Sequence, residues 1–158
     1  MTNPADGAAR VDSAVAALGL SVDIVERGDA RSLEEAAANV GVEPSQVVKT
    51  LVLKRSDGTY VFALVPGGRA LSWPKIRAVL GVNKVQMPRP EQALEATGFE
   101  RGTIVPLGST TAWPVIADAT ISGRVALGAG RPGHSLLTEA EPLLHALDAT
   151  VADISDPE

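Results

Sequence analysis

Short runs of alternating apolar and polar residues, separated by glycine, proline and capping residues, predict a series of small strands and helices. The most regular stretch, residues 45–68, reads SQVVKTLVLKRSDGTYVFALVPGG. It contains two apolar runs on either side of the turn residues 56–58. Two such runs around a tight turn predict a β-hairpin with strands 47–55 and 59–65.

One residue of the predicted hairpin does not fit its apolar pattern. Side chains alternate between the two faces of a strand, so Lys49 begins a row that continues with Leu51 and Leu53. An ammonium group at the end of an apolar row costs free energy unless it reaches water or meets an anion. Both explanations remain open from the pattern alone.

The rest of the chain predicts helices and strands in mixed order. Ser32 with Glu35, and Thr138 with Glu141, have the spacing of capping boxes at helix starts. The expected helices cover residues 8–18, 32–41, 72–81, 90–97 and 138–148, with a short turn of helix at Pro44. The expected strands, besides the hairpin, cover residues 21–27, 84–87, 115–121, 124–130 and 149–155. Residues 98–114 hold many glycines and prolines and predict a long ordered loop.

This order favours an α+β fold, a compact single domain with a central mixed β-sheet flanked by helices, because a doubly wound fold would alternate strands and helices more regularly. At 158 residues the chain has the length of one domain, so we expect residues 1–158 to form it. Residues 1–19 would be an N-terminal helical segment of the same domain.

The composition excludes several classes of protein. There is no cysteine, which excludes disulfides, a thiol nucleophile and thiolate metal sites. No long apolar run or signal peptide is present, so we expect a cytoplasmic protein that does not contact a membrane. We expect neither a metal nor a cofactor.

Positive charge is concentrated in one segment. Residues 49–89 contain eight basic residues and one acidic residue, a net charge of +7 within a chain whose total is −5. The rest of the chain therefore carries −12. A basic patch on an acidic body is typical of a surface that faces phosphate, although scattered solvated side chains would give the same count.

Few residues outside this segment point to chemistry. No nucleophile elbow, phosphate-binding loop or zinc motif occurs. His145 lies in an apolar helix pattern, Asp118 ends an apolar strand, and His134 lies in a glycine-rich turn. A structural role explains the first two best. The candidates that remain are Lys49 and the loop Gly102–Pro106, where a glycine permits a ligand to approach backbone N–H groups.

Several motifs occur in an order that is similar to a known family. These are AAANVGVEPSQVVKTLVL with its Lys49-Thr50 pair, VPGG at the end of the hairpin, the Gly102–Pro106 loop, and GAGRPG at residues 128–133. From about residue 20 to the C-terminus the chain resembles the YbaK/prolyl-tRNA-synthetase-associated domain family. The members of this family are aminoacyl-tRNA deacylases that act in trans.

The resemblance implies an enzyme that hydrolyses the ester of a mischarged tRNA. Its partner would be the acceptor end of that tRNA, and prolyl-tRNA synthetase or an elongation factor are further candidates. Lys49 and Gly102 match the catalytic positions, Lys49 holding the acceptor end through its phosphate. We expect substrate contacts from Thr50, Thr103, Ile104, Val105, Pro106, Gly128, Gly130 and His134.

An aminoacyl ester is already activated, so positioned water, the substrate's own ribose hydroxyl and backbone donors could suffice for hydrolysis.

The glycine-rich turn at 128–130 and Ser135 depart from the pattern of the cysteine-clearing members. Of the possible substrates, tRNA(Pro) carrying Cys or Ala is favoured, and Ser and Thr stay open. The alternative function is a non-catalytic module that binds tRNA, nucleotides or a protein partner through the same basic surface.

Overall fold

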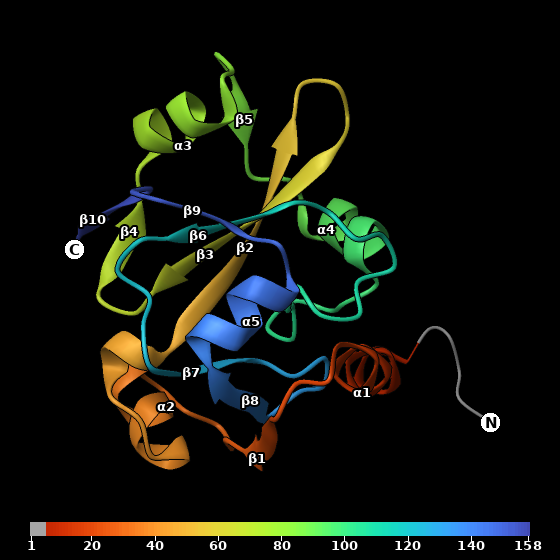
Figure 1. The fold of residues 1–158 in the computed structure, drawn as a ribbon, viewed down its shortest axis with the longest axis vertical. Coiled ribbons are helices and arrows are strands. Elements are labelled where there is room, and N and C mark those ends of the chain that lie inside the picture. Colours follow the sequence, from red (N-terminus) through yellow and green to blue (C-terminus); the bar gives the residue numbers. More distant parts are fainter. Residues whose placement is uncertain (1–5) are drawn as a thin grey trace.

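The structure, a computed structural model, describes residues 6–158. The helices are α1 (Gly7–Leu18), α2 (Leu33–Val40), the 3₁₀-helix η1 (Pro44–Gln46), α3 (Trp73–Leu80), α4 (Pro90–Thr97) and α5 (Ala140–Ala146). The strands are β1 (Asp23–Glu26), β2 (Val48–Arg55), β3 (Tyr60–Pro66), β4 (Arg69–Leu71), β5 (Val85–Gln86), β6 (Val115–Asp118), β7 (Arg124–Gly128), β8 (His134–Glu139), β9 (Thr150–Ala152) and β10 (Ser155–Pro157). Their arrangement is shown in Figure 1.

The expected hairpin is the centre of a five-stranded mixed sheet with the order β5-β2-β3-β6-β9. β2 pairs antiparallel with β3, and Lys49 lies opposite Val65. β6 and β9 continue the sheet in parallel with β3. This confirms the expected α+β fold with a central mixed sheet flanked by helices.

A second, antiparallel sheet has the order β1-β8-β7 and lies below the central sheet in Figure 1. The two sheets approach each other where β2 begins, because Val47 forms a parallel bridge with Ala126 of β7. A two-stranded sheet of β4 and β10 adjoins the start of α3. The C-terminal strand β10 therefore pairs with a strand from the middle of the chain, β4.

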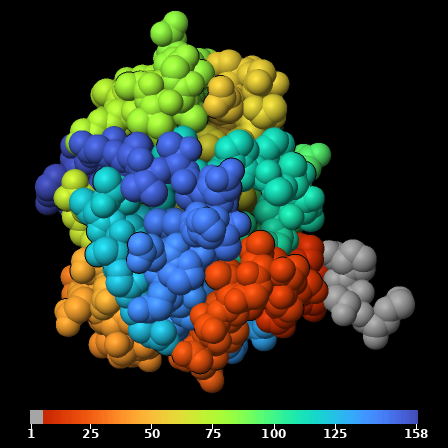
Figure 2. Space-filling view, viewed as in Figure 1, coloured from red at the N-terminus to blue at the C-terminus, as the bar shows by residue number. Residues whose placement is uncertain are grey.

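Both faces of the hairpin are buried. Val52 and Phe62 belong to a large apolar cluster between the two main sheets, whereas Leu53 and Val61 belong to a smaller cluster on the other face. The row that begins with Lys49 faces the smaller cluster. Val11 of α1 and Leu143 of α5 both join the large cluster, and Figure 2 shows these two helices side by side on one surface of the molecule.

Local capping signals predicted two of the helix starts and misled at a third. Ser32 Oγ accepts a hydrogen bond from the Glu35 N–H, and Ser72 caps α3 in the same way. Thr138 does not cap a helix, so that expectation was wrong: it lies in β8, and its hydroxyl donates to the Ser21 carbonyl, while α5 begins after Glu139. A long-range strand pairing outweighed the local motif.

Three strands were not expected from the pattern, namely β4, β8 and β10. β8 is almost fully buried and so does not alternate. The expected loop at residues 98–114 contains no helix or strand.

Within residues 6–158, no helix has the length and apolar character needed to cross a membrane. Residues 1–5 of the expected N-terminal segment lie outside the described part, and the single-domain assignment stays a prediction.

Candidate functional site

The junction of the two main sheets contains a cavity of about 360 Å³, which we call the first cavity. The start of β2, the end of β7, helix α2 and the loop at residues 101–104 surround it. Its walls are mostly apolar. Five residues expected in the site line it: Lys49, Thr50, Gly102, Ile104 and Gly128. The sheets thus bring together three segments that are far apart in the sequence.

The other expected site residues lie around the first cavity rather than in its lining. Thr103 and Val105 are buried. Pro106 borders a different cavity beside Trp113. Gly130 packs against α1, since a Cβ atom there would lie 2.7 Å from the Gly7 carbonyl oxygen. Their substrate contacts stay predictions.

His134 also lies outside the lining of the first cavity. Its Nδ1 is 2.9 Å from the Pro132 carbonyl oxygen, and the residue pairs with Glu26 of β1. The next residue, Ser135, is buried and lines the cavity in its place. Alternation along β8 is the physical reason, because adjacent residues face opposite sides of a strand.

Lys49 reaches from the first cavity towards the C-terminal end of the chain. Its Nζ donates a hydrogen bond of 2.9 Å to the Arg69 carbonyl oxygen and lies 3.6 Å from a carboxylate oxygen of Glu158. The Lys49 side chain remains 43% exposed. The ammonium at the end of the apolar row is therefore accessible to solvent, with one backbone and one carboxylate partner.

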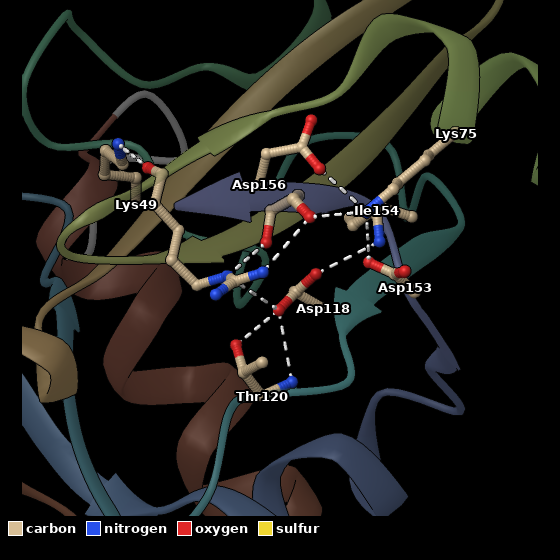
Figure 3. Close-up of polar contacts among 9 residues, drawn as sticks. Lys49, Lys75, Asp118, Thr120, Asp153, Ile154 and Asp156 are labelled. Carbon is tan, nitrogen blue, oxygen red and sulfur yellow. Dashed lines mark hydrogen bonds and ion pairs between the residues drawn. The ribbon is translucent and has the colours of Figure 1, made fainter. Parts of the chain in front are cut away.

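Arg69 is held in place by a buried carboxylate. Its Nε donates to Ser155 Oγ at 2.7 Å and lies 3.8 Å from Oδ2 of Asp118. Figure 3 shows Asp118 with its partners Thr120 and Ile154. Asp118 is 1% exposed and accepts hydrogen bonds from the Ile154 N–H and from Thr120. Asp118 thus fixes the segment whose carbonyl group contacts Lys49, which is the structural role expected for it.

The environment of Asp118 keeps its carboxylate ionised. Burial favours the neutral form, but hydrogen bonds from Thr120, Ile154 and Ser155 outweigh burial and hold the pKa below the usual value for aspartate. A lowered pKa in the folded state stabilises the fold at pH values above the ordinary aspartate pKa. That stabilisation is lost as the pH falls through the lowered value.

Gly102 gives the loop beside the cavity its conformation. Its φ is +85°, in the region that side-chain-bearing residues avoid, and the residue is exposed. A Cβ atom there would meet no other atom within 4 Å. Among residues 6–158, no carbonyl group accepts the Gly102 N–H. A backbone donor is thus available at the mouth of the cavity.

Gly128 permits the loop to lie against β7. Its φ is not positive, but a Cβ atom at this position would lie 2.5 Å from the Ile104 carbonyl oxygen. The same loop is tied to the glycine-rich turn by a hydrogen bond from the Gly130 N–H to the Thr103 carbonyl oxygen. The two glycine-containing segments therefore form one unit.

We expect Gly128→Ala to displace this loop. The added methyl group forces backbone movement, which should lower the free energy of unfolding by about 1–3 kcal/mol, as overpacking does elsewhere. Urea denaturation measures this change. An unchanged midpoint would contradict it and would show that the loop moves aside at little cost.

Comparison with known proteins identifies the family. Residues 27–145 match the family model described as the aminoacyl-tRNA editing domain. The chain belongs to this family. The match covers both cavity-lining strands and the loop that contains Gly102.

The editing domain is also similar to parts of larger proteins. It is 39% identical over 99 residues to a proline–tRNA ligase of Thermosipho melanesiensis, covering 63% of this chain and 17% of the ligase. The ligase of Acidithiobacillus ferrooxidans is 34% identical over 116 residues, covering 73% of this chain and 20% of the ligase. The chain therefore spans about a fifth or less of the length of these curated relatives.

One solved structure matches the editing domain over nearly its whole length. It is described as a candidate trans-editing enzyme for prolyl-tRNA synthetase, and it superposes with a TM-score of 0.86 at 30% identity. The match covers 99% of each chain. This neighbour confirms the fold and the family resemblance that the motifs implied.

Sequence reasoning missed two arginines of the editing domain. Arg27 and Arg101 both line the first cavity, and neither guanidinium has a hydrogen-bond or ion-pair partner among residues 6–158. Arg101 precedes Gly102 directly, so the loop motif contained a signal for it. Arg27 reaches the cavity only because β1 and β2 belong to adjoining sheets, which no local pattern shows.

Six of the eight cations of the basic segment fall into two groups in the structure. Lys49, Arg69 and Lys75 have carboxylate partners, mostly from the C-terminal segment, as Lys75 does with Asp153 and Asp156. A second group surrounds a small pocket of about 190 Å³ between the hairpin tip and β5: Lys54, Arg55 and Lys84. None of these three has an ion pair with a carboxylate among residues 6–158.

No group of three or more acidic, histidine or cysteine side chains that could hold a metal ion occurs in the described part of the chain. The chemistry of the first cavity rests on one ammonium group, two arginines, hydroxyl groups and backbone amides. Such a set can bind an anion and orient a polar ester, and its apolar wall can hold a small side chain.

Proposed function

We propose that this protein is an aminoacyl-tRNA deacylase that acts in trans and hydrolyses the ester of a mischarged tRNA. The observation that carries the proposal is the first cavity, where an accessible lysine and a loop with a free backbone N–H flank a small apolar space. Membership of the editing-domain family supports it. So does the solved neighbour described as a candidate trans-editing enzyme, which matches nearly the whole chain.

In the proposed mechanism, Lys49 holds a phosphate of the acceptor end near the ester. An incoming phosphate would replace Glu158, whose carboxylate is 3.6 Å from the ammonium group and largely exposed. Exposed ion pairs contribute only about 0–1 kcal/mol, so this exchange costs little. The Arg69 carbonyl group, fixed through Asp118 and Ser155, keeps the ammonium group oriented.

The Gly102 loop would stabilise the charge that develops during hydrolysis. Water attacks the ester carbonyl carbon, and the carbonyl oxygen becomes an oxyanion that accepts a hydrogen bond from the free backbone N–H. The ribose hydroxyl next to the ester positions the water. The carbon–oxygen bond to the ribose then breaks, and the ribose oxygen takes up the proton that the attacking water loses. This releases the amino acid and a tRNA with a free hydroxyl group.

The unpaired cations at the hairpin tip extend the proposed tRNA-binding surface. Arg55 follows Lys49 by six residues on the same strand, which corresponds to about 20 Å. A nucleic acid whose end lies in the first cavity can therefore place backbone phosphates near Lys54, Arg55 and Lys84. Binding of this kind weakens as salt is added, because counterions released from the phosphates drive it.

The substrate proposed is tRNA(Pro) carrying Cys or Ala. The relatives that match this chain are proline–tRNA ligases, which motivates the choice of tRNA. Prolyl-tRNA synthetase or an elongation factor would be the partner that delivers the substrate. The proposed activity belongs in the cytoplasm, where aminoacyl-tRNA is used. An apolar pocket separates side chains that differ by one methylene group by only about 1–3 kcal/mol, so neighbouring substrates should react more slowly rather than not at all.

The experiment that tests the proposal measures deacylation of tRNA(Pro) charged with Cys, Ala, Ser, Thr or Pro. We expect rapid loss of the Cys or Ala ester and retention of the Pro ester. Uncatalysed hydrolysis of each ester provides the baseline. If no ester is hydrolysed faster than this baseline while the tRNA still binds, the deacylase proposal is wrong.

A second function has a specific observation in its favour. Lys49 Nζ already has a carbonyl and a carboxylate partner within the chain. A module that only binds tRNA, nucleotides or a protein partner needs no free ammonium group in the cavity and could use the unpaired cations alone. Binding without hydrolysis in the experiment above would support this alternative.

A further inference from the structure

The first cavity is lined by three cations and by no carboxylate. The cations are Arg27 directly after β1, Lys49 on β2 and Arg101 in the loop between α4 and β6. Within residues 6–158, no aspartate or glutamate belongs to the lining. An aminoacyl ester carries an α-amino group, and such a group is mostly an ammonium ion at neutral pH because its pKa is about 7.7–8.0. The lining therefore presents like charges to this group and no counter-ion.

Two of the three cations have no anionic partner. Neither the Arg27 nor the Arg101 guanidinium forms an ion pair among residues 6–158. Lys49 differs, because a carboxylate oxygen of Glu158 lies 3.6 Å from its Nζ. In the proposed mechanism a phosphate takes the place of Glu158, so Lys49 keeps an anionic partner. The two arginines then remain as the unbalanced charges of the cavity.

Arg27 is fixed at the cavity wall by its backbone. Its N–H donates to the Gly133 carbonyl oxygen at 2.7 Å, and its own carbonyl oxygen accepts a hydrogen bond of 3.0 Å from the Asn39 side chain of α2. Arg27 is half-buried, whereas Arg101 is exposed. Water and salt screen a partly buried charge less than an exposed one, so we expect Arg27 to have the larger effect on a group inside the cavity.

The other charged groups near this wall lie outside the cavity. Glu26 of β1 pairs with His134 of β8, and adjacent residues of a strand face opposite sides. β7 and β8 contribute only uncharged residues to the lining. Acidic residues occur in the neighbouring segments without lining the cavity: Glu26, Asp29, Glu34, Glu35, Glu43 and Glu100. The charge that an α-amino group meets in the cavity is therefore positive.

The hydrogen-bonding groups of the lining also suit an uncharged partner. A guanidinium only donates hydrogen bonds, so its partner must be an acceptor. The nitrogen of a neutral amine accepts through its lone pair, whereas an ammonium ion has no lone pair. The uncharged polar side chains of the lining are the hydroxyl groups of Thr50 and Ser135. Thr50 Oγ1 is buried and has no hydrogen-bond partner among residues 6–158.

We propose that the first cavity accepts the acyl group of its substrate only when the α-substituent carries no charge, and that Arg27 enforces this selection. The inference rests on the proposed function and deepens it by naming the form of the substrate. An α-ammonium group releases its proton to solvent as the ester enters the cavity, because nearby like charges favour the neutral amine. Esters of α-hydroxy acids lack this charge at any pH. The α-hydroxyacyl-tRNAs are therefore a second class of substrate.

Two uncleavable forms of tRNA(Pro) test the proposal. Both end in 3′-amino-3′-deoxyadenosine, and the 3′ nitrogen carries either an alanyl or a lactyl group as an amide. Filter binding measures the affinity of the wild-type protein for each. At about pH 6.8 only about a tenth of the free alanyl groups are neutral, so the lactyl form should bind about tenfold more tightly. At about pH 9 most are neutral, and the two affinities should agree within about twofold.

Three results would overturn the inference. The first is a lactyl form that binds no more tightly than the alanyl form at about pH 6.8. The second is a lactyl advantage that persists unchanged at about pH 9, because a difference in shape and not in charge would explain it. The third is a protein that binds neither tRNA.

Substitutions of Arg27 test the residue assignment. Arg27→Glu should reverse the preference at low pH, since a carboxylate stabilises the ammonium form, and Arg27→Lys should keep the lactyl advantage. Arg55→Glu makes the same charge change at an unpaired cation outside the first cavity, and it should weaken the binding of both tRNAs equally. If Arg27→Glu does not fold, Arg27→Gln should reduce the lactyl advantage instead. An Arg27 variant that folds and weakens both tRNAs equally would show a phosphate contact and contradict the assignment.

The outcome is separable from that of the proposed function, because neither tRNA can be hydrolysed. A protein that prefers the lactyl form at low pH but deacylates no tRNA has the selective cavity and lacks the proposed activity. A protein that deacylates tRNA yet binds both forms equally has the activity and lacks the selection.

Discussion

Lys49→Ala is expected to lower the kcat for deacylation of mischarged tRNA(Pro) by about a hundredfold or more, the effect of losing one well-placed electrostatic group in other enzymes. The side chain is 43% exposed and its ion pair is long, so the fold should remain intact. Single-turnover deacylation with saturating protein measures the rate. Thermal denaturation checks that the stability is unchanged.

Lys54→Ala is the matched control for this prediction. It removes the same side chain from the same strand, at a position in the basic pocket and outside the first cavity. We expect Lys54→Ala to raise KM and leave kcat nearly unchanged. If Lys49→Ala retained the full rate, the proposed role of the ammonium group would be wrong.

Gly102→Val should abolish hydrolysis while tRNA binding changes little. A β-branched residue at a φ of +85° is strained by about 1–3 kcal/mol, and the loop relieves this strain by rotating the peptide groups that present the backbone N–H. The expected result is a kcat reduced by more than about a hundredfold. Filter binding of uncharged tRNA measures the affinity in parallel.

Gly58→Val provides the comparison, because Gly58 has the same φ of +85° and equally open surroundings, but lies in the turn of the hairpin. It should lose similar stability and keep its kcat. A Gly102→Val protein that still hydrolyses the ester would show that this loop does not stabilise the oxyanion. The pair also distinguishes an enzyme from a binding module, since a module has no hydrolysis to lose.

The elements that were predicted correctly depend on neighbours in the sequence. The β2–β3 hairpin follows from alternation around a tight turn, and the starts of α2 and α3 follow from serine caps. β8 was not predicted, because it is buried on both faces and its apolar and polar residues do not alternate. The Thr138 motif was misleading because pairing with distant strands decided the state of that segment.

The residues of the candidate site also divide into those that local motifs reveal and those that only the folded structure reveals. Lys49, Thr50 and Gly102 were found because their motifs are local, and the structure places them in one cavity. Arg27 was not found, because its approach to the cavity depends on two sheets meeting. His134 and Ser135 are adjacent in the sequence, and only the register of β8 shows that Ser135 faces the cavity.

The sequence by itself determined the family, through the order of several motifs along the chain. It also determined the hairpin, the serine caps of α2 and α3 and the two glycine-containing segments, because each of these is encoded within a few consecutive residues. Only the tertiary structure decided which cations are paired. Arg69 and Lys75 meet carboxylates contributed by β6 and the C-terminal segment, more than 40 residues away in the sequence, whereas Lys54, Arg55 and Lys84 form no ion pair within residues 6–158. Charge interactions depend on distance in space, and the sheet order sets that distance.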